Sequence, residues 1–160
     1  MALAPEQAAR LRALVFGRRA AALGTLQDGA PFVSMTPFAW DDGSGAFVVH
    51  VSGLAAHTKA MRREPRVSLM VMQPEGEGTQ AQALARVTVQ AEAAECPGGS
   101  PEEAAARAAY LARFPEGEPL TAFGDFAFFR LRPVQARFVG GFAQAASLTG
   151  DTLAQLLRSS

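Results

Sequence analysis

A tight turn between two apolar runs is the feature that most constrains how this chain can fold. Asp28-Gly29 stands between the runs 21–26 and 31–39. An Asp-Gly pair flanked in this way is the strongest short-range signal for a β-hairpin. A second turn, with glycines at 43 and 45, precedes the apolar run Ala46–Ser52. Hairpin connections join antiparallel strands, so an antiparallel sheet is expected from the first third of the chain.

The remaining pattern adds strands and helices that do not alternate strictly. Ser100 is expected to cap a helix, because Pro101 occupies its first position and Glu103 completes a capping box. The absence of strict alternation disfavours a doubly wound parallel sheet. We expect one α+β domain over residues 1–160, mainly β, in which antiparallel strands close into a split β-barrel. Strands are predicted over 66–72, 83–94, 126–131 and 134–138, loops over 74–82 and 115–119, and helices over 5–17, 54–64, 100–113 and 148–157.

Charge and cysteine content exclude several classes of function. The 15 Lys and Arg residues balance 15 Asp and Glu residues, which argues against general binding of nucleic acid. The only cysteine, Cys96, excludes an intrachain disulfide and a multi-cysteine zinc site. No apolar run approaches the roughly 20 residues that span a bilayer, and the N-terminal charges lie within a helical pattern rather than a signal peptide. We therefore expect a cytoplasmic protein without a membrane partner.

The segment from Ser52 to Lys59 is the first candidate ligand site. It joins a strand to a helix through Gly53. Its side chains include the hydroxyls of Ser52 and Thr58, the imidazole of His57 and the ammonium group of Lys59. Unpaired N–H groups and the helix dipole make such a helix start attractive to anions. Four cations against Glu64 give residues 57–66 a local charge of +3 without the histidine. The same residues also fit the solvated face of an amphipathic helix.

The segment Val33–Phe38 is the second candidate. Ser34 and Thr36 share one face of the predicted strand, and Pro37 requires an edge or an interrupted strand. The free backbone groups of such a strand could contact a planar ring. An ordinary barrel strand would show the same pattern.

Catalytic and metal sites are not indicated. His50 and His57 are too far apart for the i, i+4 metal pair of a helix, and His50 is expected to be a buried, hydrogen-bonded core residue. Cys96 has no cationic neighbour in sequence that would favour a nucleophilic thiolate.

Two stretches of the chain resemble a known family. TLQDGAPFVSMTPFAWDDGSGAFVVHVSGLAAHTKAMRREPRVSLMV resembles the first half of the pyridoxamine 5'-phosphate oxidase-like flavoproteins, which have a split β-barrel. AAYLARFPEGEPLTAFGDFAFFRLRPVQARFVGGFAQA resembles their haem-utilisation (HugZ-like) branch. The resemblance implies a homodimer that binds FMN at the subunit interface. It further implies that the cofactor contacts are Ser34, Met35, Thr36, Pro37, Val51, Ser52, His57, Thr58, Lys59 and Arg86.

The resemblance is incomplete at the C-terminal strand. Val139 stands near the position of a family tryptophan, and the Arg-Leu-His run of the vitamin B6 oxidases does not follow it. We therefore expect an FMN-dependent oxidoreductase whose flavin exchanges electrons or hydride with an unidentified small-molecule substrate or electron donor. The alternatives are a haem-binding or haem-degrading protein and a non-catalytic flavin-binding module. The absence of histidine after His57 departs from the haem-degrading members, which use a C-terminal histidine.

Overall fold

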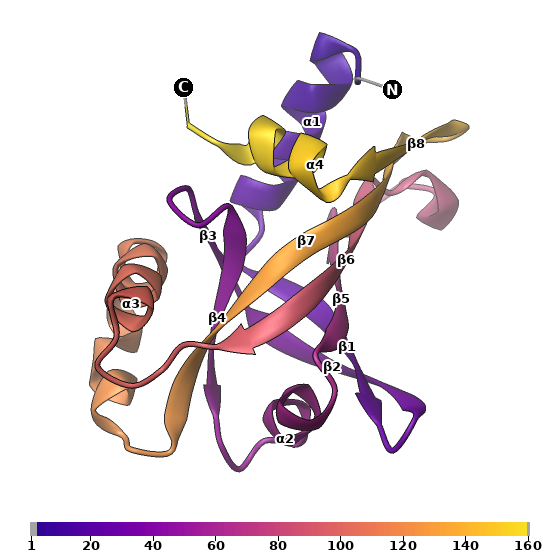
Figure 1. Ribbon diagram of the computed structural model, residues 1–160. Helices are drawn as coiled ribbons and strands as arrows, with labels where there is room; N and C mark the ends of the chain where they lie inside the picture. The colour runs from indigo at the N-terminus through magenta and orange to yellow at the C-terminus, as the bar shows by residue number, and fades with distance from the viewer. Residues whose placement is uncertain (1–2, 160) are drawn as a thin grey trace.

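The computed structural model describes residues 3–159 and has one antiparallel sheet with helices around it (Figure 1). The predicted α+β fold is confirmed. The helical segments are α1 (Pro5–Gly17), α2 (Ala56–Arg63), α3 (Pro101–Arg113), α4 (Gly150–Leu157) and the 3-10 turns η1 (Ala81–Ala83) and η2 (Pro115–Ala122). The strands are β1 (Ala20–Gln27), β2 (Ala30–Pro37), β3 (Ala39–Asp41), β4 (Ala46–Ser52), β5 (Arg66–Met72), β6 (Arg86–Glu95), β7 (Phe126–Gly141) and β8 (Gln144–Thr149).

The predicted hairpin is formed by β1 and β2. Its ladder runs from Ala20 opposite Pro37 to Gln27 opposite Ala30. Asp28 and Gly29 have φ angles of 51° and 80°, as a two-residue type I′ turn requires at both central positions. The Asp-Gly pair thus sets the register of the first two strands.

The sheet follows the order β2-β1-β5-β6-β7-β4-β3, and β8 pairs with β7 beside this path. Its two ends are neighbours in sequence, since only Phe38 separates β2 from β3. The apolar run predicted over 31–39 therefore divides, and β3 pairs with β4. No ladder joins β2 to β3 or β4 in the described part of the chain, so the strands curl into an open sheet rather than a closed barrel.

The sheet is split between β1 and β5. Their ladder covers only Ala22–Gly24 against Ser68–Met70, whereas β1 pairs with β2 along its whole length. Beyond Gly24 the hairpin leaves β5, and Figure 1 shows its tip projecting away from the other strands.

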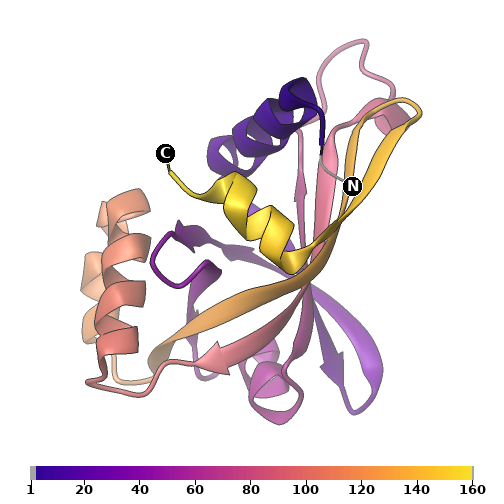
Figure 2. The same cartoon turned by 45° about the horizontal axis from the view of Figure 1, so that its top comes forward.

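The helices cover three parts of the sheet. α1 and α4 lie beside each other against β7 (Figure 2), and they bury Leu11, Val15 and Leu153 in the main core. α3 covers β3 and β4 and buries Tyr110 in a second cluster. α2 packs on β1 and β6 at the end of the sheet opposite α1 and α4.

The C-terminal third departs from the sequence prediction. The strands predicted over 126–131 and 134–138 form one strand, β7. Its pairing with β6 continues past Pro133 because the register shifts there: Ala91 lies opposite Pro133, but Gln90 lies opposite Gln135. Such a bulge tolerates a proline that lacks the N–H donor. Residues 144–149 form β8, and α4 begins only at Gly150, where Thr149 caps it. The loop predicted over 115–119 is part of the 3-10 turn η2, which spans Pro115–Ala122.

No helix among residues 3–159 is long and apolar enough to cross a membrane.

Leu153 tests the packing of α4 on the sheet, because its side chain is fully buried. Leu153→Ala should lower the free energy of unfolding by about 3 kcal/mol through lost burial and the cavity left behind. Gln155→Ala, at an exposed position of the same helix, should change it by less than about 0.5 kcal/mol. Urea unfolding measures both values, and equal values would contradict the packing of α4 described above.

Candidate functional site

The turn from β4 into α2 is held by its own backbone and by the residue before β7. Ser52 Oγ accepts a hydrogen bond from the Leu54 amide at 3.1 Å, and the Ser52 carbonyl accepts from the Ala55 amide at 3.1 Å. The Gly53 amide donates to the Asp125 carbonyl at 2.6 Å. A Cβ atom on Gly53 would lie 2.8 Å from the same carbonyl oxygen, closer than real Cβ contacts. Glycine is therefore required where the two segments meet.

The start of α2 has the properties of an anion site. Ala55 is the N-cap residue and makes no side-chain cap, so the first amides of α2 lack a side-chain acceptor. Thr58 is fully buried, and its hydroxyl has no hydrogen-bond partner among the described residues. A buried hydroxyl without a partner is unusual. Together these groups offer donors to an acceptor supplied by a ligand.

His57 connects this turn to the edge strand. Its Nδ1 and Ser34 Oγ share a hydrogen bond of 2.9 Å, which brings together two residues named from the sequence. Burial lowers the pKa of the His57 imidazole from its ordinary value of 6.5. The ring is therefore neutral at pH 7 and contributes a hydrogen bond rather than a positive charge.

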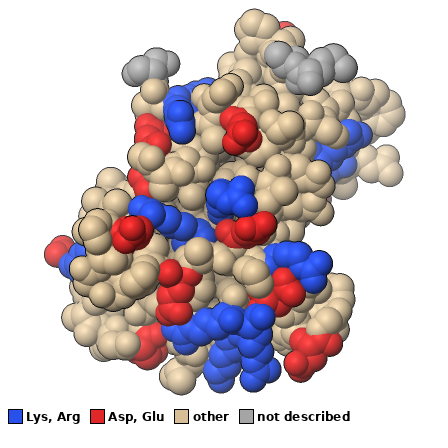
Figure 3. Space-filling model, in the orientation of Figure 1, with Lys and Arg blue, Asp and Glu red and all other residues tan. Residues whose placement is uncertain are grey.

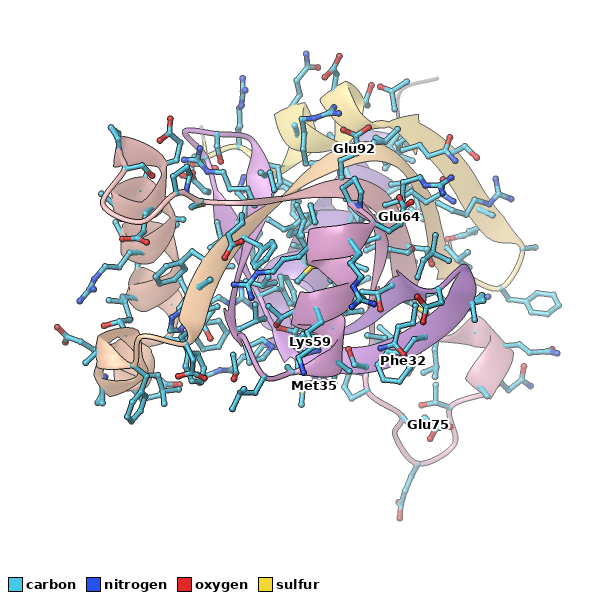
Figure 4. The ribbon with its side chains drawn as sticks, turned by 60° about the horizontal axis from the view of Figure 1, so that its bottom comes forward. Phe32, Met35, Lys59, Glu64, Glu75 and Glu92 are labelled. Carbon is cyan, nitrogen blue, oxygen red and sulfur yellow. The ribbon has the colours of Figure 1, made fainter. Side chains whose placement is uncertain are left out.

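The positive charge of the site comes from the other side chains of α2. Lys and Arg residues gather over this helix in Figure 3. Arg62 is held by Glu95 at 2.6 Å, and Arg63 lies 3.8 Å from Asp28. Lys59 and Arg63 line a hollow of about 270 Å³ between α2 and the tip of the β1–β2 hairpin. Figure 4 looks onto α2, with Lys59 on the helix and Glu64 beyond its C-terminal end.

β2 lies at one end of the sheet order, so the edge position predicted for this segment is confirmed. An edge strand leaves a row of backbone donors and acceptors unpaired. The exposed fraction is 68% for Val33 and 64% for Met35, whereas Thr36 is buried and its hydroxyl donates to the Pro37 carbonyl at 2.9 Å. A ligand could therefore contact the β2 backbone and Met35, but the Thr36 hydroxyl already has a partner.

Two of the residues implied by the resemblance lie apart from this cluster. Val51 is buried in the main core. Arg86 pairs with Met72 at the C-terminal end of β5, whereas Ser34 is level with Leu69 of β5 through β1. Arg86 is therefore offset from Ser34 by three residues along the strands, about 10 Å, and by the strands β1 and β5 across the sheet. The Arg86 guanidinium donates to the carbonyls of Leu84 and Gln82 at 2.9 and 3.3 Å.

A cleft of about 450 Å³ occupies the split between the hairpin and β5. Ligand pockets commonly measure 300–1,000 Å³. Leu26 lines both this cleft and the hollow that contains Lys59, so the two lie next to each other at β1. The cleft was missed from the sequence, although the isolated Gly24 within an apolar strand signals a close approach. Its lining is mainly apolar: Gly24, Thr25, Leu26, Pro31, Phe32, Val33, Arg66, Val67, Ser68, Gln90, Ala91, Glu92 and Val134.

The other reactive side chains lie outside the site. His50 is buried as predicted, but its ring stacks on Phe128 with centroids 4.2 Å apart instead of forming the predicted hydrogen bond to another described residue. Burial raises the pKa of the Cys96 thiol, which agrees with the expectation that it is not a nucleophile. No cluster of three or more His, Cys, Asp or Glu side chains suited to a metal ion occurs within residues 3–159.

Comparison with known proteins identifies the family. The sequence profile described as pyridoxamine 5'-phosphate oxidase matches residues 7–140. The chain therefore belongs to the pyridoxamine 5'-phosphate oxidase family, as the resemblance predicted.

The chain is similar to several proteins whose names refer to heme. It is 34% identical over 155 residues to the chloroplastic heme oxygenase HOZ of Arabidopsis thaliana, covering 91% of this chain and 46% of HOZ. It is 36% identical over 126 residues to the heme oxygenase HutZ of Vibrio cholerae, covering 78% of this chain and 70% of HutZ. A heme-binding protein from Mycobacterium smegmatis has a similar structure, with a TM-score of 0.83 and 31% identity over 96% of this chain and 62% of that one. The chain thus spans about half of HOZ and less than two thirds of the mycobacterial protein.

The lowered pKa of His57 predicts a pH dependence of stability. The folded protein binds fewer protons at this ring than the unfolded chain does. The contribution of His57 to the free energy of unfolding is therefore present above pH 6.5 and is lost as the pH falls through the pKa of His57 in the folded protein. Urea unfolding should show a free energy that decreases from about pH 7 to about pH 5.5.

The matched variant is His57→Asn, whose amide can keep the bond to Ser34 without titrating. Its free energy of unfolding should decrease less over the same range. The free energy of unfolding of the variant should still decrease with falling pH, because the pKa of His50 is lowered as well. Burial is the larger cause of that lowering and the charge of Arg107 is the smaller one. Equal slopes in the two proteins would contradict a half-buried, neutral His57.

Proposed function

We propose that this protein binds haem and serves haem utilisation. The observation that carries the proposal is its identity of 34% and 36% with two proteins named as heme oxygenases, over 155 and 126 residues. These lengths include most of the sheet and α2. The similarity favours haem over the flavin-dependent oxidoreductase expected from the sequence.

The cleft between the hairpin and β5 is suited to a flat, apolar ligand. Gly24 contributes no side chain to it, and a Cβ atom there would already touch Ser68 at 3.6 Å. Phe32, Val33 and Val67 add apolar surface on both sides of the split. We propose that these residues pack against the porphyrin ring, whose burial would supply most of the binding free energy.

Cations lie where the carboxylates of haem could reach them. Lys59 and Arg63 line the neighbouring hollow, which shares Leu26 with the cleft, and Arg66 lies at the cleft itself. The exposed Arg66 is paired with the half-buried Glu64 at 2.8 Å, which leaves Lys59 as the favoured partner for a carboxylate. When bound, haem would supply the iron for oxygen or electron chemistry. The role proposed for the chain's own cleft residues is to bind and orient the ring, because neither His50 nor His57 lines the cleft.

We also propose the homodimer that the resemblance implies. β2 exposes Val33 and Met35 next to its free edge, and a second copy could cover this apolar surface. Such a dimer would place the haem cleft next to the subunit interface, because Val33 belongs to both surfaces.

A hemin titration tests the proposal. The purified protein should give a saturable shift of the Soret band at one haem per chain. Val33→Asp places a charge in the cleft at an exposed position, so it should weaken binding about tenfold without unfolding the protein.

The matched control is Leu120→Asp, at an exposed leucine in η2 outside the cleft, which should bind as the unchanged protein does. Light scattering on each variant separates a loss of haem affinity from a loss of the dimer. Absence of a Soret shift in the unchanged protein, or equal affinity in both variants, would count against haem binding in the cleft.

FMN binding is a second candidate, favoured by the start of α2. The missing N-cap, the unpartnered Thr58 hydroxyl and the adjacent Lys59 form the kind of site that holds a phosphate. Lys59→Gln should therefore weaken FMN more than riboflavin, which lacks the phosphate, by about three- to fivefold. Quenching of flavin fluorescence measures both affinities. An equal loss for the two flavins would refute the phosphate assignment.

A further inference from the structure

Asp125 contacts the ligand-binding turn from a distant part of the sequence. It lies just before β7, 73 residues after Ser52, and its Oδ2 accepts a hydrogen bond from the Ser52 hydroxyl at 2.9 Å. The Asp125 carbonyl also accepts from the Gly53 amide. Side chain and backbone of one residue therefore both engage the turn that leads into α2.

The contact removes Ser52 as a donor to any anion. A serine hydroxyl carries a single proton, and here Asp125 accepts it. The lone pairs of the same oxygen accept from the Leu54 amide. Ser52, which the resemblance implies as a cofactor contact, thus has no donor left for a phosphate in this arrangement.

Asp125 also brings a negative charge to the turn that leads into α2. A carboxylate near a helix N-terminus competes with an anionic ligand for the field of the helix dipole. Arg62 lies near Gly53, with its Nη1 atom 3.5 Å from where a Cβ would be. Its Nε and Nη2 atoms are bound by Glu95, so this guanidinium is only partly available to neutralise Asp125.

We propose that Asp125 is a specificity-determining residue that biases the site against a phosphate-bearing flavin. It does so by accepting the Ser52 proton and by repelling the phosphate from the α2 turn. The inference deepens the proposed function, on which it rests, because it explains how a fold of this family can favour haem over FMN. Asp125 is absent from the cleft lining, so it need not affect the porphyrin ring.

The test compares FMN with riboflavin as probes in variants of the full chain. Asp125→Ala frees the Ser52 hydroxyl and removes the charge, so the ratio of FMN to riboflavin affinity should rise about fivefold. Asp125→Asn removes the charge but keeps an oxygen that can accept the Ser52 proton, so the ratio should rise about twofold. Glu77→Ala, which removes an acid from the exposed loop before η1, should leave the ratio unchanged.

The outcomes separate specificity from a merely structural role. If Asp125 only braced the turn, Asp125→Ala would weaken both flavins alike and leave their ratio unchanged. The Gly53–Asp125 backbone bond survives each substitution at position 125, and a thermal melt of each variant checks the fold. An unchanged or lower ratio, or no measurable FMN binding in Asp125→Ala, overturns the proposal. The hemin titration of these variants should match that of the unchanged protein, so a failure of haem binding is recognised separately.

Discussion

The early separation of β1 from β5 is the constraint on which the rest of the site depends. Three residue pairs join these strands, while the Asp28-Gly29 turn holds β1 to β2 along eight. The hairpin therefore diverges from the sheet beyond Gly24, and an apolar cleft lies between it and β5. The hairpin tip also forms one wall of the hollow above Lys59. A single departure in strand pairing thus creates both the surface proposed for the haem ring and the space between that surface and the cations of α2.

The second constraint is the contact between the β4–α2 turn and the residue before β7. Because Gly53 accommodates the Asp125 carbonyl, two segments far apart in sequence meet at the start of α2. The neutral His57 then links α2 to the edge strand through Ser34. The electrostatics of the site are therefore more mixed than the local charge of +3 indicates. Lys59 attracts anions, Arg62 is engaged by Glu95, and Asp125 opposes a phosphate at the turn.

Local signals in the sequence were sufficient for most elements of the first two thirds of the fold, although the run 31–39 divides into β2 and β3. The Asp28-Gly29 turn, the strand Ala46–Ser52, the strand Arg66–Met72 and the Ser100 cap all form where they were expected. β7 was predicted as two strands because a proline normally interrupts a strand, whereas here a bulge in the pairing with β6 accommodates Pro133. That compensation depends on a partner strand about 40 residues away, which a local pattern does not contain.

The candidate site could be predicted only in part from the sequence, because parts of it depend on contacts between distant segments. Residue type and helix position indicated the α2 turn, and the pairing of Ser34 with His57 fits the two segments singled out. The role of Asp125 depends on a contact between distant segments, and the cleft depends on where strand pairing stops. Arg86 matched the family pattern, yet it lies at the other end of β5 from α2. Whether it contacts a ligand remains a prediction.

The most direct test of the account is the position of iron in crystals of the protein grown with hemin. Anomalous diffraction at the iron absorption edge locates the metal independently of the surrounding density. We expect one peak per chain over the cleft between the hairpin and β5, with the porphyrin beside Gly24 and Val33 and its carboxylates toward Lys59. A peak elsewhere on the chain, or crystals of the hemin-saturated protein without an ordered peak at this cleft, would contradict it.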